Sequence, residues 1–394
     1  MKAYAVDAKT VIRPFNDPPS KCLILNRELS KIQDEALSSM GIGIERTDSP
    51  EEVSLGEEHV LFSDNLYFTE DMLKEFIDRS RKIGGSTVCA LKRGLVTLRS
   101  ITATQDVKIT EDSVEYPLFY TPASGSRNAY RPVVIDPEEF VETIRLPTHM
   151  FGSEGYPVPS TTRFLSQISH WANLWAANLS ALLGRIAALR KAPKSRLLLL
   201  ALRARSANQW KVLRKTNQIG KNCDVHPSAY LEGCRVGDNV EVGAGAVIRL
   251  AEIGNNVSIG NNVAVYLSVL GDRCKIFDGA NIEFSVLYPG SVIDARLIEA
   301  SLLGIDSFVG DGASLTDFRF DRKTIQVVKD SVAIDTGNHV LGVCLGHRAY
   351  LGSGCIVAPG REIPNGLRIV PEKSKVITKA SGDEEMEGCR RVSV

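Results

Sequence analysis

Residues 345–369, LGHRAYLGSGCIVAPGREIPNGLRI, carry an aliphatic side chain at every sixth position. The repeated positions are Leu345, Leu351, Val357, Ile363 and Ile369. An aliphatic residue at this spacing is the signature of a parallel β-helix, in which each hexad forms one short strand of a triangular coil. We therefore expect these five side chains to point into the coil and to stack on one another.

The same spacing recurs upstream, beginning at Ile219, and several of the aliphatic residues are followed by glycine. A glycine suits a corner of the coil, where a side chain would crowd the next turn or where φ must be positive. The pattern predicts a coil over residues 217–371. It is interrupted between residues 311 and 340, and we expect a loop there that leaves one corner and lines a site. Aliphatic–glycine pairs stand at residues 236–237, 242–243, 253–254, 259–260, 303–304 and 309–310.

The 394 residues are enough for two domains with separate cores, and the net charge of zero argues against a nucleic-acid partner. The eight cysteines lack metal-binding spacing, so we expect reduced thiols in a cytoplasmic protein. The N-terminus lacks the pattern of a signal peptide. The longest apolar run, residues 197–202, is too short to span a bilayer.

Residues 1–155 alternate strand-like and helix-like segments. Lys2–Val6, Val60–Phe62 and Ser86–Ala90 resemble strands, whereas Arg27–Met40 and Thr69–Lys82 resemble helices, the second with Thr69 as its N-cap. Alternation of this kind predicts an α/β domain around a largely parallel sheet.

Residues 155–223 contain twelve lysines and arginines and no acidic residue. We expect residues 156–216 to be helical and to join the two domains, and residues 372–394 to form a flexible tail. One hypothesis is a linker helix packed on both domains. The other is that residues 185–216 form a peripheral membrane surface or a docking site for an acidic protein partner.

The order of several short motifs resembles that of sugar-1-phosphate nucleotidyltransferases that carry a C-terminal left-handed β-helix. Within that family, the C-terminal motifs are most similar to the bifunctional archaeal nucleotidylyltransferase/acetyltransferases and, more distantly, to bacterial N-acetylglucosamine-1-phosphate uridylyltransferase. The resemblance covers residues 1–371. The motifs are RPFNDPPSK (13–21), SDNLYF (63–68), NLWAAN (173–178), GDGASLTDFRFDRKT (310–324) and DTGNHVLG (335–342).

This resemblance implies a Rossmann-like α/β nucleotidyltransferase domain, a helical linker and a left-handed parallel β-helix. Coils of the family commonly pack as trimers, so we expect a homo-oligomer. The implied ligand is a sugar phosphate or a nucleotide, and the implied role lies in nucleotide-sugar or cell-envelope metabolism.

Nucleotidyl transfer in the family uses a glycine-rich loop that cradles phosphate with backbone N–H groups. When the family pattern G-G-x-G-T-R-L-R-P is aligned on Arg13 and Pro14, only Thr10 matches among the loop residues. The glycine positions fall on Val6, Asp7 and Lys9, and the position of the catalytic arginine falls on Val11. Asp7 should repel a triphosphate, and Lys9 offsets this only in part.

The resemblance implies further site residues for an NTP substrate with Mg²⁺. Lys21 matches the lysine that contacts phosphate, and together with Arg13 it is our candidate catalytic cation. Asp64 matches the first metal-binding aspartate, but the second falls on Gln167, which offers no charge. We expect Mg²⁺ to bind weakly here and the reaction to be weakened or lost.

Acetyl transfer in the bifunctional relatives uses a histidine of the coil. Here its position falls on Asp294, an aspartate whose ordinary pKa of about 3.9 makes it a poor base at neutral pH. Asp317 stands in place of an asparagine that orients the substrate, and Lys323 matches the lysine of this stretch. His339 and His347 stand at unmatched positions. We therefore do not expect acetyl-CoA as a cofactor.

Three functions remain open at this point. The protein is a nucleotidyltransferase-like enzyme using Lys21 and Asp64, a non-catalytic regulatory or scaffolding subunit, or an acyltransferase acting at the coil. The altered loop and Gln167 favour the second.

Overall fold

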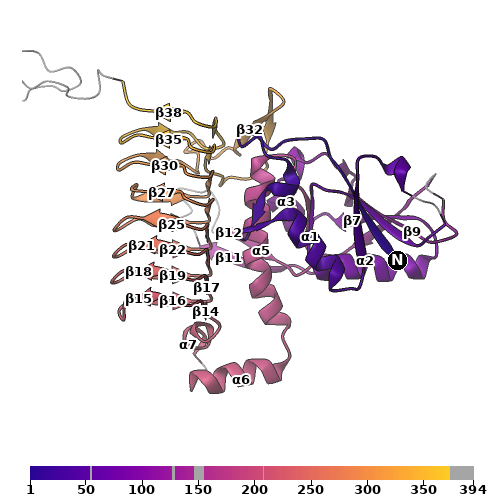
Figure 1. Ribbon diagram of the computed structural model, residues 1–394, viewed down its shortest axis with the longest axis horizontal. Helices are drawn as coiled ribbons and strands as arrows, with labels where there is room; N and C mark the ends of the chain where they lie inside the picture. The colour runs from indigo at the N-terminus through magenta and orange to yellow at the C-terminus, as the bar shows by residue number, and fades with distance from the viewer. Residues whose placement is uncertain (54–55, 127–128, 146–154, 207, 373–394) are drawn as a thin grey trace, which may run out of the picture.

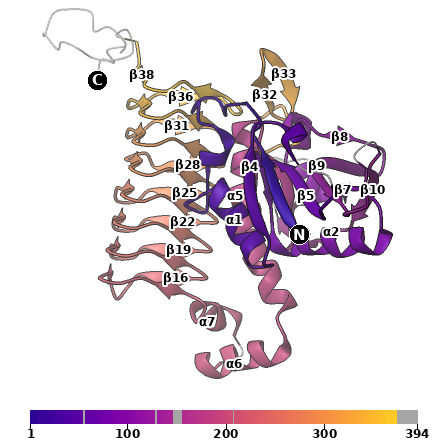
Figure 2. The same ribbon diagram turned by 45° about the vertical axis from the view of Figure 1, so that its right-hand side comes forward.

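The computed structural model describes residues 1–53, 56–126, 129–145, 155–206 and 208–372 (Figure 1). Nearly all of the predicted tail lies outside these residues. Two bodies lie side by side, an N-terminal α/β domain and a tall coil, with helix α5 (Trp171–Lys191) between them. Both orientations of the molecule show this arrangement (Figures 1 and 2).

The N-terminal domain is built around a seven-stranded mixed sheet with the order β10-β7-β9-β5-β1-β4, and β8 pairs with β9. The prediction of a largely parallel sheet is wrong. Strand β9 runs antiparallel between β5 and β7, and β8 joins β9 by a tight turn. No strand was expected at β9, so the sequence pattern missed this reversal. The strands are β1 (Lys2–Val6), β4 (Gly43–Thr47), β5 (His59–Ser63), β7 (Thr87–Lys92), β8 (Lys108–Ile109), β9 (Ser113–Thr121) and β10 (Arg131–Ile135).

Helices α1 (Leu29–Ser38) and α2 (Glu70–Ile83) lie close to their predicted positions. α2 has acidic residues in its first turn and basic residues in its last, an arrangement that is favourable with the helix dipole. Its C-cap is Gly84 in the left-handed conformation, which ends the helix and reverses the chain. Thr69 is the N-cap residue of α2, as predicted, but its side chain makes no capping hydrogen bond. Its Oγ1 donates instead to the Thr162 carbonyl over 2.7 Å, which ties α2 to a distant segment.

Several short elements complete the domain. The expectation that residues 156–216 are helical is wrong at their start, because β12 extends to Ser160 and β13 pairs antiparallel with β6 of the domain. The helices beyond it are α5, α6 (Lys194–Ala204) and α7 (Gln209–Arg214). The remaining elements are α3 (Leu95–Arg99), β2 (Leu23–Ile24), β3 (Arg27–Glu28), β6 (Leu66–Phe68), β11 (Phe140–Arg145), β12 (Gly155–Ser160) and β13 (Leu165–Gln167), with short 3₁₀ turns at Pro19–Lys21, Pro50–Glu52 and Thr102–Thr104.

The C-terminal half forms three parallel sheets that run the length of a coil, so the predicted parallel β-helix of stacked hexads is confirmed. Each strand pairs with the strand one turn away, for example Val242 with Ile259 and Ile259 with Ile276. The repeated aliphatic residues point inward and form one continuous core. The left hand of the coil stays a prediction from the resemblance.

The strands of the coil are short, mostly two residues each. The first sheet contains β14 (Gln218–Ile219), β17 (Arg235–Val236), β20 (Glu252–Ile253), β23 (Val269–Leu270), β26 (Val286–Leu287), β29 (Leu302–Leu303), β34 (Cys344–Leu345) and β37 (Glu362–Ile363). The second contains β15 (Asp224–Val225), β18 (Glu241–Val242), β21 (Ser258–Ile259), β24 (Lys275–Ile276), β27 (Val292–Ile293), β30 (Phe308–Val309), β35 (Tyr350–Leu351) and β38 (Arg368–Ile369). The third contains β16 (Tyr230–Glu232), β19 (Val247–Arg249), β22 (Ala264–Tyr266), β25 (Asn281–Glu283), β28 (Leu297–Glu299), β31 (Ser314–Leu315) and β36 (Ile356–Val357).

Glycine at one corner shows why the repeat needs it. A Cβ atom on Gly254 would lie 2.6 Å from the backbone nitrogen of Asp272 in the next turn. Other corners use asparagine in the left-handed region, such as Asn256 at φ 56°. Asparagine tolerates this conformation and bonds locally, so both residue types allow the coil to turn tightly.

The coil leaves its repeat after β31, later than the predicted break at Asp311. The excursion contains the hairpin of β32 (Gln326–Lys329) and β33 (Val332–Asp335). Lys329 of this hairpin donates to Asp106 of the N-terminal domain over 2.6 Å. The loop therefore joins the coil to the domain across the top of α5 (Figure 2).

Helix α5 packs on both bodies and carries part of a shared apolar core. Trp175 donates its ring N–H to the Phe284 carbonyl of the coil over 2.7 Å. Asn178 accepts from the Leu25 amide and donates to the Leu23 carbonyl of the domain. Helix α5 thus fixes the coil and the domain together through buried hydrogen bonds.

The seven described cysteines are all free thiols, as the spacing of cysteines predicted. Within the described part of the chain, no helix is both long and apolar enough to cross a membrane.

Candidate functional site

The C-terminal ends of β1, β4 and β5 meet at one edge of the N-terminal sheet, because these strands run parallel. A small hollow of about 310 Å³ lies there. Its charged residues are four acids and one arginine, so the hollow is negative overall. They are Asp7, Asp48, Glu52, Asp64 and Arg46.

The loop after β1 uses its backbone N–H groups within the protein. Ala8 donates to Asp64 Oδ1 over 2.9 Å, and Lys9 donates to Asp7 Oδ1 over 2.8 Å. Burial raises the pKa of Asp64, and the nearby Asp7 adds to this, while the Ala8 N–H opposes it. This loop is not an open phosphate cradle, because carboxylates occupy the positions where phosphate oxygens would bind. Thr10 and Lys9 are exposed on it.

Gln167 pairs with Leu66 of β6, two residues after Asp64. Its Nε2 donates to the side chain of the adjacent Asn65 over 3.4 Å, and its Oε1 is buried without a partner. A neutral amide adds no charge to attract Mg²⁺. Among the described residues, no group of three or more His, Cys, Asp or Glu side chains is placed to hold a metal ion. The donor set does not fit the Mg²⁺ expected at Asp64.

The predicted catalytic cations contact other parts of the molecule. Arg13 lies near Glu362 of the coil, where its charge opposes the rise that burial causes in the pKa of that carboxyl. Lys21 is exposed and lies 4.0 Å from Glu28. Within the described residues, neither cation forms a hydrogen bond or an ion pair with Asp64.

The segment around Arg13 is docked on the coil instead. Phe15 stacks on His347 with ring centroids 4.7 Å apart, and His347 Nε2 lies 2.9 Å from Asp17 Oδ2. Asn365 donates to the Phe15 carbonyl over 2.7 Å. The Tyr288 hydroxyl accepts from the Leu23 amide over 2.8 Å and donates to the Leu23 carbonyl over 3.4 Å. The family-like opening segment therefore serves as a joint between domain and coil.

A second and larger cavity, the interdomain cavity, lies between the domain, α5 and the coil. Its volume is about 510 Å³. Its walls are mostly apolar and aromatic, with polar groups on two opposing sides. The lining includes Arg99 and Tyr156 of the domain, Glu283, Phe284, Glu299 and Asp317 of the coil, and Asn338 of the excursion.

Three carboxyl groups converge on the coil side of this cavity. Glu283 and Glu299 are paired neighbours on β25 and β28, and Asp317 stands two residues after the end of β31. Burial raises the pKa of Glu299 to about 7, with further increments from Asp317 and Glu283. Burial also raises the pKa of Asp317. Glu299 therefore exchanges its proton near neutral pH, which suits acid–base chemistry.

The domain side of the cavity presents one cation. The guanidinium of Arg99 lies 3.9 Å above the Tyr156 ring and donates to Asn338 Oδ1 over 2.6 Å. Burial lowers the pKa of Arg99, although it stays a cation at neutral pH. Its Nη2 has no hydrogen-bond partner among the described residues. An apolar cavity with an arginine facing carboxyl groups can hold a small ligand that is anionic at one end and hydroxylated at the other.

Of the residues predicted for the coil, the structure brings only Asp317 into this cavity. Lys323 is exposed on the excursion, and its amide donates to Asp321. His339 and Asp294 are exposed as well, and His347 belongs to the joint with Asp17.

The sequence-based prediction missed Glu283, Glu299 and Arg99. A signal existed for the first two. In the third sheet the last residue of successive strands is polar or aromatic and points out of the coil towards α5. We call these residues the third-sheet column: Glu232, Arg249, Tyr266, Glu283 and Glu299.

Comparisons with known proteins give no family. No family model and no curated protein matches the chain. One solved structure that aligns is from Bacillus cereus, a protein to which an acetyltransferase activity is provisionally assigned. It is 17% identical over 39% of this chain and 77% of its own, with a TM-score of 0.15. A likeness this weak supports no conclusion about activity.

Proposed function

We propose that this protein is a nucleotidyltransferase-like binding protein in which nucleotidyl transfer is lost, and that it binds its ligand in the interdomain cavity. One observation carries the proposal. The amides of Ala8 and Lys9, which would cradle a phosphate, are bound to carboxylates of the protein itself. A triphosphate would have to displace Asp7 and Asp64 and then sit beside their charges.

The lining of the interdomain cavity favours a sugar phosphate or a nucleotide as the ligand. Arg99 supplies a donor for phosphate at one side. Glu283 and Asp317 supply acceptors for hydroxyl groups at the other. Tyr156 and Phe284 offer aromatic faces to the apolar face of a sugar or to a base. The link to nucleotide-sugar or cell-envelope metabolism rests on the resemblance alone.

The pKa of Glu299 favours acyl transfer as a second candidate function. A deprotonated Glu299 would take the proton from a substrate hydroxyl or amine while that atom attacks a thioester carbonyl. The thiolate would leave and take up a proton from water. Because the base must be ionised, the rate should rise as pH increases through about 7.

Pyrophosphate release tests the loss of nucleotidyl transfer. With Mg²⁺, a panel of NTPs and a panel of sugar 1-phosphates, we expect no release above the protein-free rate. Release by the wild-type protein that disappears in Asp64→Ala would contradict the proposal.

Calorimetric titration with the same sugar phosphates tests the cavity. Arg99→Met should weaken binding roughly tenfold or more, because a charge-assisted hydrogen bond is lost. Lys323→Met is the matched control, since Lys323 is exposed and outside the cavity. Equal affinities of all three proteins would place the ligand elsewhere. Thiol release from acetyl-CoA that is lost in Glu299→Gln would select acyl transfer over binding alone.

We also keep the homotrimer as a proposal from the resemblance. Sedimentation equilibrium of the full chain tests it directly, and a monomer at micromolar concentration would exclude it.

A further inference from the structure

Helices α6 and α7 form one end of the molecule, far from the N-terminal sheet. Both orientations place α6 as the lowest element, lying across the ends of α5 and the coil (Figures 1 and 2). This position leaves one long side of α6 without a packing partner among the described residues.

The outer side of α6 carries leucines. Leu198 and Leu202 are 61% and 66% exposed, and a spacing of four residues places them on the same face. Lys194 precedes Leu198 by four residues and extends the same stripe, and Arg205 follows at the C-cap. Leu198 and Leu202 thus form an exposed apolar strip, bordered by cations, on a helix at one end of the molecule. This composition is typical of helices that lie in a membrane interface.

The charge of this end is strongly positive. Residues 155–223 contain no acidic residue, and the exposed cations around α6 and α7 are Lys194, Arg203, Arg205, Lys211, Arg214 and Lys215. The acids that reach this region from other segments are largely engaged. Glu142 pairs with Arg190, and Glu252 pairs with Arg185. The surface therefore complements an anionic partner.

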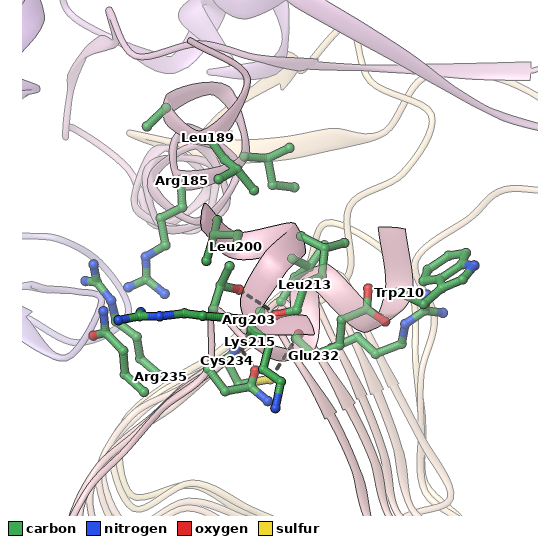
Figure 3. Close-up of a pocket in the computed structure, with 18 of the residues that line it drawn as sticks. Arg185, Leu189, Leu200, Arg203, Trp210, Leu213, Lys215, Glu232, Cys234 and Arg235 are labelled. Carbon is green, nitrogen blue, oxygen red and sulfur yellow. Dashed lines mark hydrogen bonds and ion pairs between the residues drawn. The ribbon is translucent and has the colours of Figure 1, made fainter. Parts of the chain in front are cut away.

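A cavity of about 740 Å³, the α6 cavity, is lined by residues of α5, α6, α7 and the coil (Figure 3). The guanidinium groups of Arg185, Arg203 and Arg235 turn towards one side of it, as Figure 3 shows. Arg185 Nη1 and Arg249 Nε are buried and have no hydrogen-bond partner in the described part of the chain. Buried donors without acceptors are costly, so an anionic oxygen would stabilise them.

We propose that the α6–α7 end binds the surface of an anionic phospholipid bilayer. Leu198 and Leu202 enter the apolar boundary below the headgroups, and the surrounding lysines and arginines meet lipid phosphates. The unpaired Arg185 Nη1 of the α6 cavity donates to one headgroup phosphate. Binding needs both contributions, because a short apolar strip or a basic patch alone holds a protein only weakly at a bilayer.

Flotation of the full chain with phosphatidylcholine vesicles, with and without phosphatidylglycerol, tests the proposal. We expect binding only to the anionic vesicles, and less of it as salt increases. Lys194→Ala should lower affinity roughly fivefold, as expected for one cation near the surface. Leu198→Ser with Leu202→Ser should lower it by roughly a hundredfold. Ile356→Ser is the matched control, because Ile356 is an exposed apolar residue of the coil outside this end, and should change nothing.

Tryptophan fluorescence provides a second readout. Trp171 and Trp175 are buried, whereas Trp210 of α7 is 44% exposed. A blue shift on addition of anionic vesicles should therefore come from Trp210 and disappear in Trp210→Phe. Trp210 also contacts Arg249, whose guanidinium lies 4.6 Å from its ring, so the signal reports on the α6 cavity.

Three outcomes would overturn the proposal. The first is that the vesicle assay shows no role for the leucines: either the wild-type protein does not bind anionic vesicles, or the double serine variant binds them as tightly as the wild-type protein. The second is that the double variant changes the sedimentation coefficient without changing vesicle binding, which would make α6 a contact between copies of the chain. The third is that inorganic phosphate raises the melting temperature while vesicles do not, which would assign the cavity to a soluble anion.

Discussion

The α6 cavity and the interdomain cavity are lined by the same face of the third sheet, and Tyr266 contacts both. Below Tyr266 the third-sheet column continues with Arg249 and Glu232, next to the arginines of α5 and α6. Above it the column continues with Glu283 and Glu299, next to Asp317. One repetitive scaffold thus carries a basic cavity and an acidic one about two turns apart.

The difference shows how a β-helix separates stability from function. In the three-residue strands of the third sheet, β16, β19, β22, β25 and β28, the middle residue points into the coil and is aliphatic. In these strands the last residue points outward and differs in charge from turn to turn, because it faces α5 or the domain and not the coil core. Charge can therefore change from turn to turn without disturbing the stack.

Substitution of a buried residue inside the coil should lower the free energy of unfolding more than any other change considered. The loss should be similar beside the α6 cavity and beside the interdomain cavity. Ile248 and Ile282 are fully buried in neighbouring parts of the core, one beside each cavity. Ile248→Ala and Ile282→Ala should each lower the free energy of unfolding by about 2–5 kcal/mol, because the stacked strands cannot collapse into the space. Urea denaturation measures this. A loss below about 1 kcal/mol at either position would show that the core is looser there.

Glu299 should give the acidic cavity a pH dependence that the α6 cavity lacks. Its pKa is raised from 4.5 to about 7, so between these values the folded protein holds a proton that the unfolded chain has released. The free energy of unfolding should therefore fall as pH rises through this window, by about 1–2 kcal/mol after allowance for solvent screening.

Urea denaturation at several pH values from 5 to 8 measures this slope. Glu299→Gln should remove it, because glutamine does not titrate. Arg185→Gln serves as the matched variant in the α6 cavity and should keep the slope. A slope unchanged in Glu299→Gln would assign the titration to another group.

The smallest effect is expected where Arg249 holds α7 against the coil. Its guanidinium lies 4.6 Å from the Trp210 ring. Arg249→Lys should cost about 0.5–1 kcal/mol, because lysine keeps a cation beside the buried Glu232 but cannot stack a planar guanidinium on the Trp210 ring. Hydrogen exchange should speed up in α7 and stay unchanged in α3, which faces the interdomain cavity. Equal protection of α7 in both proteins would show that Trp210 is held by other contacts.

Sequence periodicity predicted the coil well because its core is local and repetitive. Most inward residues lie five or six positions from the next, as Ile248 and Ile253 or Val242 and Ile248 do, so a single chain pattern encodes the stack. The N-terminal sheet was predicted less well. Strand β9 reverses direction between β5 and β7, and pairing of distant strands leaves no periodic trace.

The candidate site was predicted only in part. Asp317 was identified through the resemblance, and the loss of the phosphate loop was expected from Asp7 and Lys9. Arg99 was missed because it belongs to a different domain from the carboxyl groups that it faces. Arg13 and Lys21 were assigned to catalysis by their motif, but their contacts show Arg13 at the joint with the coil and Lys21 exposed beside Glu28.

The amino-acid sequence alone determined the coil, its aliphatic core and the strong positive charge of residues 155–223, since all three are properties of neighbouring residues. Only the tertiary structure decided where the polar groups converge. The packing of α5 against both bodies brings Arg99 and Glu299 into one cavity, and the fold of α6 exposes Leu198 at the end of the molecule while Arg203 lines the α6 cavity. Contacts between residues that are distant in sequence depend on long-range packing. This packing determines how deeply the polar side chains are buried, and the burial in turn shifts their pKa values.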